Sequence, residues 1–321
     1  MTDWRRLLSE HCDGYLAARL LALVAPALLL ALAGGGEAAL QGGMLAVCCL
    51  IAMERGALGW RAGLLQAALA LAGCFFMAGL WRWPLAFALG CGAAAEAACR
   101  LGARQARWRS AANFTFIPAL YLGCEAAQSS EQGMAALLPA VPWLAAGALA
   151  ACWLHGVAGR RAGMADKPGA APETGVAFVC VGLLAWLAAH FQLPCGQWLV
   201  WSGASVCVGG FAAVRAKCWQ RCSGALLGVP AGMLAALALH PTPALLMLLG
   251  AATMLTLALF RAYRPAFAAR SALAALHLSL VGGMAAVRLI DVGLAAALVL
   301  LVWGVGQWLA EEKGEFSRGG R

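Results

Sequence analysis

LAARLLALVAPALLLALAG, residues 16–34, contains a single charged side chain, Arg19, among otherwise apolar residues. A helix of this length can cross the bilayer, because the hydrocarbon core is about 30 Å thick and a helix needs about 20 residues to span it. Arg5 and Arg6 precede the run, as basic residues precede a secretory signal peptide. The apolar run that begins at Tyr15 is longer than a typical signal core, so we expect it to remain as the first membrane-spanning helix.

The composition of the whole chain points the same way. Of its 321 residues 63% are hydrophobic and 12% are charged, and the mean hydropathy is +0.79. A water-covered surface would need more charge, and apolar runs recur about every 25 residues, the length of one span with its connection. We therefore predict an all-α integral membrane protein of about twelve transmembrane helices. The predicted spans are residues 16–34, 38–53, 62–80, 83–99, 112–127, 135–154, 174–190, 194–214, 222–240, 242–260, 271–287 and 290–309.

Lys and Arg residues separate by side when these spans are threaded through a bilayer. All of the 23 except Arg82 and Arg288 fall on the side of the N-terminus. Positive residues collect on the cytoplasmic side, so both termini are predicted to be cytoplasmic, and the loops bearing Glu37 and Glu125 face away from it. The net charge of +9 is therefore a topology signal of a multi-pass membrane protein, with no nucleic acid as partner.

The chain divides near its middle. Residues 155–173 are polar and contain two prolines, which is typical of a flexible cytoplasmic linker. We expect one membrane repeat of six helices in residues 1–154 and a second in residues 174–321.

Polar and aromatic residues recur in the two halves at an offset of about 160 residues. Arg61 corresponds to Arg221, and Trp143 corresponds to Trp303. An even number of spans in each half keeps the same orientation, so the two repeats are predicted to be parallel rather than inverted.

Soluble catalytic signatures are missing from the sequence. It contains no H-E-x-x-H, no G-x-x-x-x-G-K-[ST] and no G-x-S-x-G, so we expect no catalytic residue, no enzyme activity and no cofactor. The thirteen cysteines include no C-x-x-C pair and mostly lie inside apolar runs, as Cys48 and Cys49 do. They are expected to be buried free thiols, and no metal site is predicted.

Arg221 begins a predicted helix whose glycines, Gly224, Gly228 and Gly232, recur every fourth residue. This spacing favours close packing of two helices over direct contact with a substrate. Arg221 itself is either an anchor that reaches into the interface or a ligand for an anion.

Arg288 breaks the charge rule, and Asp291 follows it three residues later. This spacing places both on one side of a helix, where they can form a structural ion pair; the alternative is an anion or proton site. His277, in the same predicted span as Arg288, is a candidate for proton coupling or a histidine bonded to a neighbouring helix. Glu96 is a second proton-coupling candidate, unless it only pairs with Arg100 one turn later.

Three short motifs occur together in this chain: Arg19 at the opening of the first span, R-x-x-G-x-x-x-G at residues 221–228, and R-L-I-D-x-G at residues 288–293. In this combination the chain resembles the fusaric-acid-resistance and aromatic-acid-exporter family, most clearly in its second half. Asp291 stands where the family often has Glu, and the chain looks like a short member without the large soluble domain.

The resemblance implies an inner-membrane exporter of small organic anions, chiefly aromatic carboxylic acids, by a passive or proton-coupled route. Arg61 and Arg221 would attract the carboxylate at the cytoplasmic mouth, and Arg288 would receive it near the exit, with Asp291 tuning that charge. A non-transporting scaffold or accessory subunit of an envelope or pigment pathway is the alternative. Partners would be the anion, the lipid bilayer, and a second copy of the chain or a periplasmic efflux protein.

Overall fold

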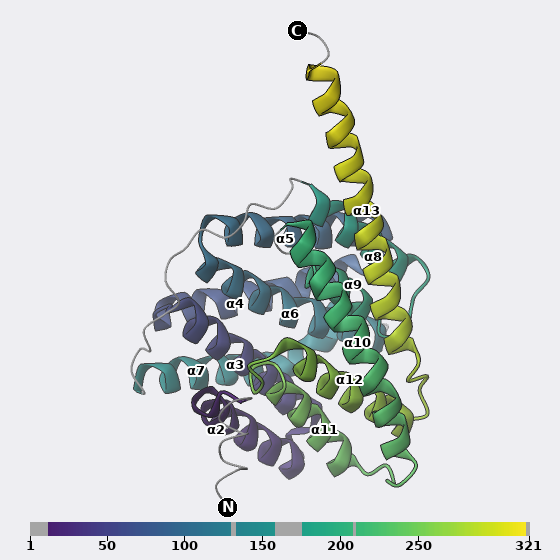
Figure 1. Cartoon of the computed structure of the whole chain (residues 1–321). Coiled ribbons are helices and arrows are strands. Elements are labelled where there is room, and N and C mark those ends of the chain that lie inside the picture. The colour runs from purple at the N-terminus through teal and green to yellow at the C-terminus, as the bar shows by residue number, and fades with distance from the viewer. Residues whose placement is uncertain (1–11, 130–132, 158–174, 208–209, 319–321) are drawn as a thin grey trace, which may run out of the picture.

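The computed structural model describes residues 12–129, 133–157, 175–207 and 210–318, which are helical and contain no β-strand (Figure 1). The helices are α2 Gly14–Leu30, η1 Ala31–Gly35, α3 Gly36–Gly56, α4 Trp60–Leu80, α5 Pro84–Arg104, α6 Ala106–Ser129, η2 Gly133–Ala140, α7 Val141–Val157, α8 Val176–His190, α9 Gly196–Ala204, α10 Phe211–Ala236, α11 Pro243–Leu255, α12 Tyr263–Leu280 and α13 Val287–Arg318. Most of the predicted linker, residues 158–173, lies outside the described residues.

Five helical segments of the described chain are long and apolar enough to cross a membrane. They are Gly14–Gly56, Trp60–Leu80, Pro84–Arg104, Gly133–Val157 and Val287–Trp308. Large apolar side chains on their outer faces are exposed, Leu29 by 66% and Leu85 by 71%, as a lipid-facing surface requires. The chain is therefore an all-helical membrane protein, as the sequence predicts.

The first two predicted spans are separated where glycine permits a break. Gly34 and Gly36 have φ values of 117° and 58°, which other residues rarely adopt. Asp13 begins α2 as its N-cap, accepting a hydrogen bond from the backbone N–H of Leu16 at 3.2 Å. The predicted boundaries of α2 and α3 therefore agree with the structure to within a few residues.

Helix boundaries in the second half differ from the prediction. The span expected at 194–214 is a short helix, α9, and α10 begins at Phe211 rather than at residue 222. Likewise α12 begins at Tyr263, eight residues before the predicted 271–287. The predicted boundaries were wrong because basic residues were assigned to loops, whereas the structure satisfies them inside helices by hydrogen bonds and aromatic rings.

The glycines of α10 bring it against α12, as their spacing predicts. A Cβ atom on Gly228 would lie 2.2 Å from the carbonyl oxygen of Ala268, and one on Gly232 would lie 2.1 Å from that of Ala272. Backbones this close leave no room for a side chain. The pair α10 and α12 therefore forms a rigid unit of the second half.

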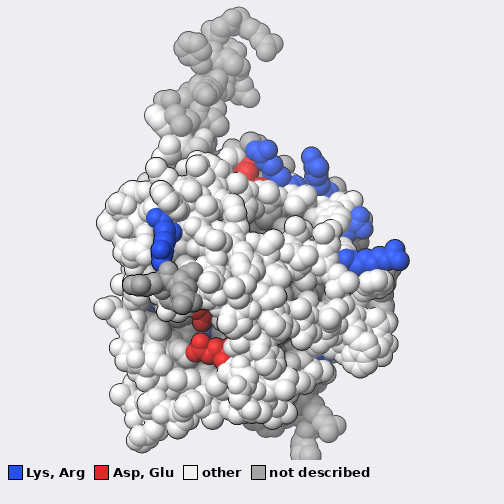
Figure 2. Space-filling model, turned by 180° about the vertical axis from the view of Figure 1, so that it is seen from behind, with Lys and Arg blue, Asp and Glu red and all other residues white. Residues whose placement is uncertain are grey.

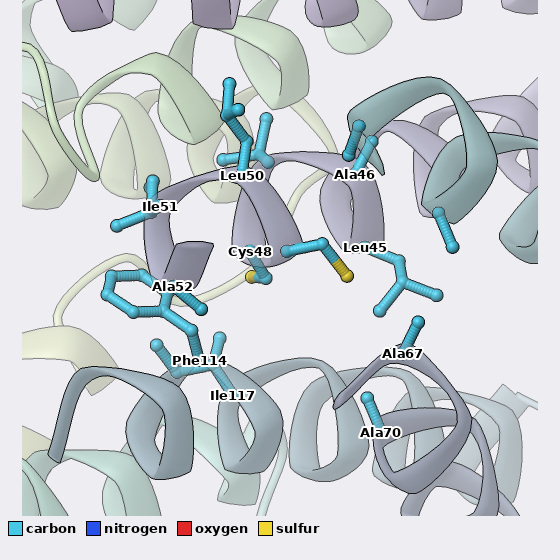
Figure 3. Close-up of a cluster of buried hydrophobic side chains, with 14 of the residues drawn as sticks. Leu45, Ala46, Cys48, Leu50, Ile51, Ala52, Ala67, Ala70, Phe114 and Ile117 are labelled. Atoms are coloured by element: carbon cyan, nitrogen blue, oxygen red, sulfur yellow. The ribbon is translucent and has the colours of Figure 1, made fainter. Parts of the chain in front are cut away.

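The buried core of the first half is centred on α3 (Figure 3). Residues 45–53 of α3 are almost completely buried, and Figure 3 shows Cys48 and Ile51 above Phe114 and Ile117 of α6. All thirteen cysteines except Cys12, Cys195 and Cys222 are buried, in keeping with their predicted role as small apolar residues.

Charged side chains are unevenly distributed over the surface. Seen from behind, most of the visible Lys and Arg side chains lie along one edge, and a group of Asp and Glu side chains lies in a hollow away from that edge (Figure 2). The remaining surface in this view is largely uncharged, as expected for a protein in lipid.

Candidate functional site

Arg221 is buried in the middle of α10 and is 2% exposed. Its Nη1 donates hydrogen bonds to the hydroxyls of Ser205 and Tyr263, the latter at 2.8 Å, and its Nη2 donates to Ser202 at 3.0 Å. Its Cζ lies 4.2 Å from the centroid of the Phe267 ring. A snorkelling position therefore does not fit this residue. Hydroxyls and one ring hold the guanidinium, and no carboxylate of the described residues forms an ion pair with it.

Arg288, in α13, is 3% exposed and lies against the same ring. Its Cζ is 5.3 Å from the centroid of Phe267 and 5.1 Å from that of Trp198 in α9. Its Nε and Nη1 have no hydrogen-bond partner. Phe267, itself 1% exposed, is thus shared by two buried guanidinium groups from different helices.

Asp291 is also buried, and its Oδ2 has no hydrogen-bond partner. The predicted ion pair with Arg288 was wrong, since none joins the two side chains in the described structure. Arg288 is instead directed toward two aromatic faces, which attract a cation through their quadrupoles. Arg288 and Asp291, at this end of α13, therefore each have buried polar atoms that make no hydrogen bond.

A cavity of about 280 Å³ opens beside Arg221 and combines cations with aromatic rings. Its basic residues are Arg55, Lys217, Arg261 and Arg270, and its aromatic residues are Phe114, Trp201, Phe260 and Tyr263. We call it the basic cavity. Its walls come from both halves of the chain, since Arg55 ends α3 and Arg270 lies within α12.

Backbone and hydroxyl oxygens hold two of these cations in place. Lys217 donates to the carbonyl oxygen of Ser205 at 3.2 Å, and Arg270 donates to the carbonyl oxygen of Thr256 at 2.9 Å. Ser205 also accepts from Arg221, so the basic cavity and the Arg221 site share a residue. No carboxylate lines the basic cavity. The arrangement can therefore attract and orient an anion that carries an aromatic ring.

A second cavity, of about 400 Å³, lies at the other end of the same helices and is acidic. Glu37, Glu125 and His277 line it together with apolar residues and three methionines, Met44, Met247 and Met254. We call it the acidic cavity. His277, a predicted proton-coupling residue, therefore lies in one cavity with two carboxylates. The described residues contain no group of three side chains suited to hold a metal ion.

Two predicted site residues lie elsewhere. Arg61 is exposed at the start of α4, with its Cζ 5.4 Å from the centroid of the Trp60 ring, and lines neither cavity. Glu96 is buried in α5 and accepts a hydrogen bond from Nε of Arg100 at 2.8 Å. This is the structural pair that the sequence offered as the alternative to a proton-coupling role. The structure thus brings together Arg221 and Arg288 but not Arg61 or Glu96.

A third buried arginine, Arg19, has a different environment in the first half. Its Nη1 pairs with Oε1 of Glu54, which also contacts Nδ1 of His155 at 2.7 Å. Arg19 further donates to the hydroxyl of Tyr15 at 3.0 Å and to the carbonyl oxygen of Leu154 at 3.0 Å. Helices α2, α3 and α7 are joined by this network.

Arg270, Lys217 and Tyr263 were missed by sequence reasoning, and so were the carboxylates of the acidic cavity. The position of Glu125 could have indicated the acidic cavity, because this residue falls inside the predicted span 112–127 and charged residues within spans mark functional sites. Arg270 and Lys217 gave no such signal, because they were assigned to loops.

Comparison with known protein families matches residues 179–302, which run from α8 into α13, to the family described as fusaric acid resistance protein-like. No curated protein and no solved structure matches the chain. The matched segment contains Arg221, Phe267 and Arg288.

Proposed function

We propose that this chain, which belongs through residues 179–302 to the fusaric acid resistance protein-like family, exports small organic anions, chiefly aromatic carboxylates. Export would be passive or proton-coupled and would cross the bacterial inner membrane. The observation that carries this proposal is a pair of buried arginines, Arg221 and Arg288, that share one aromatic ring and form no ion pair with any carboxylate of the described residues.

The energetics of buried charge support an anionic ligand. Moving an isolated ion out of water is expensive by several kcal/mol, and buried charges are usually paired. Arg288 lacks such a partner and keeps two donors unused. A carboxylate accepts two parallel hydrogen bonds from a guanidinium group, and its aromatic ring can pack against Phe267 or Trp198. An aromatic carboxylate therefore supplies both the charge and the ring that the site accommodates.

The two cavities suggest a route. Ile117 lines the basic cavity and Leu122 lines the acidic cavity, both from α6. Five residues of helix rise about 7.5 Å, so only a thin apolar layer separates the two cavities along α6. We propose that the basic cavity is the cytoplasmic entrance and the acidic cavity the opposite mouth. His277, together with Glu37 and Glu125, is our candidate for proton coupling there.

We also propose that the twelve helices α2 to α13 form two parallel repeats of six, with both termini in the cytoplasm. Equivalent helix pairs pack in both halves. In the first half α2 packs on α3, α4 packs on α6 and α5 packs on α6; in the second half the corresponding pairs are α8 and α9, α10 and α12, and α11 and α12. Joining the halves, α5 packs on α8 as α11 packs on α2. This pattern fits an approximate two-fold axis along the membrane normal.

The proposal is tested by flux of para-hydroxybenzoate across proteoliposomes that contain the purified chain. We expect protein-dependent flux in the wild type. Arg288→Gln should lower it about ten- to a hundredfold, because a hydrogen bond to a charged group contributes about 1.5–3 kcal/mol. Arg61→Gln, which removes an equal charge from an exposed position, is the matched control and should leave flux within about twofold of the wild type.

An imposed pH gradient distinguishes the two routes: it accelerates proton-coupled flux and leaves passive flux unchanged. Absence of flux above that of empty liposomes, over a panel of aromatic acids, would contradict the proposal and favour the scaffold alternative. Equal loss in Arg288→Gln and Arg61→Gln would remove the buried pair as the substrate site.

A further inference from the structure

A cavity of about 550 Å³, larger than the basic and acidic cavities and separate from both, is an apolar groove between α4, α5 and α6. We call it the α4–α6 groove. Of its lining residues only Gln66, Thr115 and Trp108 carry a side-chain oxygen or nitrogen. Leu65 and Leu69 line it and are 63% and 55% exposed, so the groove opens onto the lipid-facing surface.

The hollow lies between two helices, α4 and α5, that each pack closely against another helix. A Cβ on Gly92 of α5 would lie 2.7 Å from the carbonyl oxygen of Phe178 in α8, and one on Gly73 of α4 would lie 2.7 Å from the Cβ of Ala119 in α6. Thus α5 packs closely against α8, and α4 packs closely against α6. Small residues, among them Ala94 and Ala97, leave the space between α4 and α5 unfilled.

Toward the end far from the basic loops the groove is closed. A Cβ on Gly90 of α5 would lie 3.1 Å from the ring of Phe76 and 3.1 Å from Leu80, both of α4. At the other end Leu101 and Trp108 line the groove, where α5 ends and α6 begins. The opening therefore lies on the predicted cytoplasmic side.

Four arginines lie close in the chain to Leu101 and Trp108: Arg100 and Arg104 are in the last turns of α5, and Arg107 and Arg109 flank Trp108 in α6. The Cζ of Arg107 lies 5.5 Å from the centroid of the Trp108 ring. A tryptophan among arginines at the end of a helix is the arrangement expected at the level of lipid headgroups. This end of the groove thus combines an apolar slot with positive charge.

Gln66 provides an independent sign of a ligand inside the groove. It is 5% exposed, and its Nε2 donates to the carbonyl oxygen of Phe114 at 3.1 Å, while its Oε1 is buried with no hydrogen-bond partner. Phe114 is five residues beyond Arg109 on α6, a rise of about 7.5 Å. A ligand of headgroup size can therefore reach both the arginines and the unused acceptor of Gln66.

We propose that the α4–α6 groove binds an anionic phospholipid of the cytoplasmic leaflet with a hydroxyl-bearing headgroup, such as phosphatidylglycerol. One acyl chain fills the slot, Arg104 and Arg109 bind the phosphate, and a headgroup hydroxyl donates to Gln66. Because Phe114 also lines the basic cavity, the bound lipid contacts the helix that forms one wall of the substrate entrance.

The test does not require transport. The purified chain is reconstituted into nanodiscs of phosphatidylcholine with a small fraction of phosphatidylglycerol of the same acyl chains, then released into detergent, and the lipid retained is measured by native mass spectrometry. We expect selective retention of phosphatidylglycerol. The double variant Arg104→Gln/Arg109→Gln should bind it about ten- to thirtyfold more weakly, since each basic residue near an anionic headgroup contributes about a factor of five.

Two further variants keep the result interpretable. Ala97→Phe, which fills the groove from an exposed position, should displace the lipid without removing charge. Arg82→Gln, on the opposite side of the predicted membrane, is the charge control and should retain it. Equal retention of both lipids, retention by the double variant, or a second copy of the chain covering the groove in cross-linking would each overturn the proposal.

Discussion

Two buried arginine sites, one in each half of the molecule, stabilise a positive charge within the membrane protein in different ways. In the first half Arg19 pairs with Glu54, whose carboxylate is shared with His155. In the second half Arg221 and Arg288 lie against the ring of Phe267, and neither forms an ion pair with a carboxylate in the part of the chain that the structure describes. Both networks contain buried nitrogens without a hydrogen-bond partner, Nε of Arg19 and Nε2 of His155 in the first and Nε and Nη1 of Arg288 in the second. The sites differ in the carboxylate, which is present at Arg19 and, among the described residues, absent from ion pairs with Arg221 and Arg288.

The difference separates a structural from a functional use of the same side chain. A guanidinium that already pairs with a fixed carboxylate gains little from binding a mobile anion. A guanidinium held only by hydroxyls and aromatic rings keeps its charge available for one. The paired arginine should therefore matter for stability and the unpaired arginines for transport.

Breaking the paired site should have the largest effect on folding. Arg19→Ala leaves the Glu54 carboxylate buried without its cation, and such a loss is expected to lower the free energy of unfolding by about 3–5 kcal/mol. Unfolding in mixed detergent micelles, followed by circular dichroism, measures it. The double variant Arg19→Met/Glu54→Leu should recover most of the stability, and a double variant as unstable as Arg19→Ala would contradict an ion-pair role.

Removing an unpaired arginine should spare the fold. Arg288→Met gives up cation–π contacts of about 0.5–2 kcal/mol but also removes a buried charge that makes no direct ion pair among the described residues, so the unfolding free energy should change by no more than about 1 kcal/mol. The same micelle assay applies, with Arg19→Ala as reference. If both variants lose stability equally, the distinction between the two sites is wrong.

The tyrosines whose hydroxyls accept a hydrogen bond from Arg19 and from Arg221 allow a finer comparison of the two sites. Tyr263→Phe removes one acceptor from Arg221 and should lower para-hydroxybenzoate flux about fivefold, because a single hydrogen bond contributes about 1 kcal/mol. Tyr15→Phe removes the corresponding acceptor from Arg19 and should leave flux unchanged. Similar flux in the two variants would show that the Arg221 network does not position substrate.

The smallest effect is expected at Glu96. Its partner Arg100 has a side chain that is 61% exposed, and ion pairs with one exposed member contribute about 0–1 kcal/mol. Glu96→Gln should therefore change flux by less than about twofold, with or without a pH gradient. Loss of gradient-driven flux in this variant, with normal flux in its absence, would restore Glu96 as a proton-coupling residue.

The all-helical membrane fold could be predicted from the sequence because it depends on composition and spacing. The run at residues 16–34 and the glycine spacing at Gly228 and Gly232 are local patterns, and the structure has the helix and the close helix packing that they favour. Arg221 and Arg288 could also be singled out, since a lone cation in an apolar stretch needs a special environment.

The environment itself was decided only by the tertiary structure. Whether a buried arginine meets a carboxylate or a ring depends on which helices pack together, and no spacing within α13 shows that Arg288 lies against the rings of Trp198 and Phe267. The basic cavity is likewise assembled from α3, α6, α9, α10 and α12, whose residues are far apart in the chain. The hydrophobic pattern of a sequence determines that helices enter the membrane, whereas side-chain packing between distant helices determines which charges remain free to act.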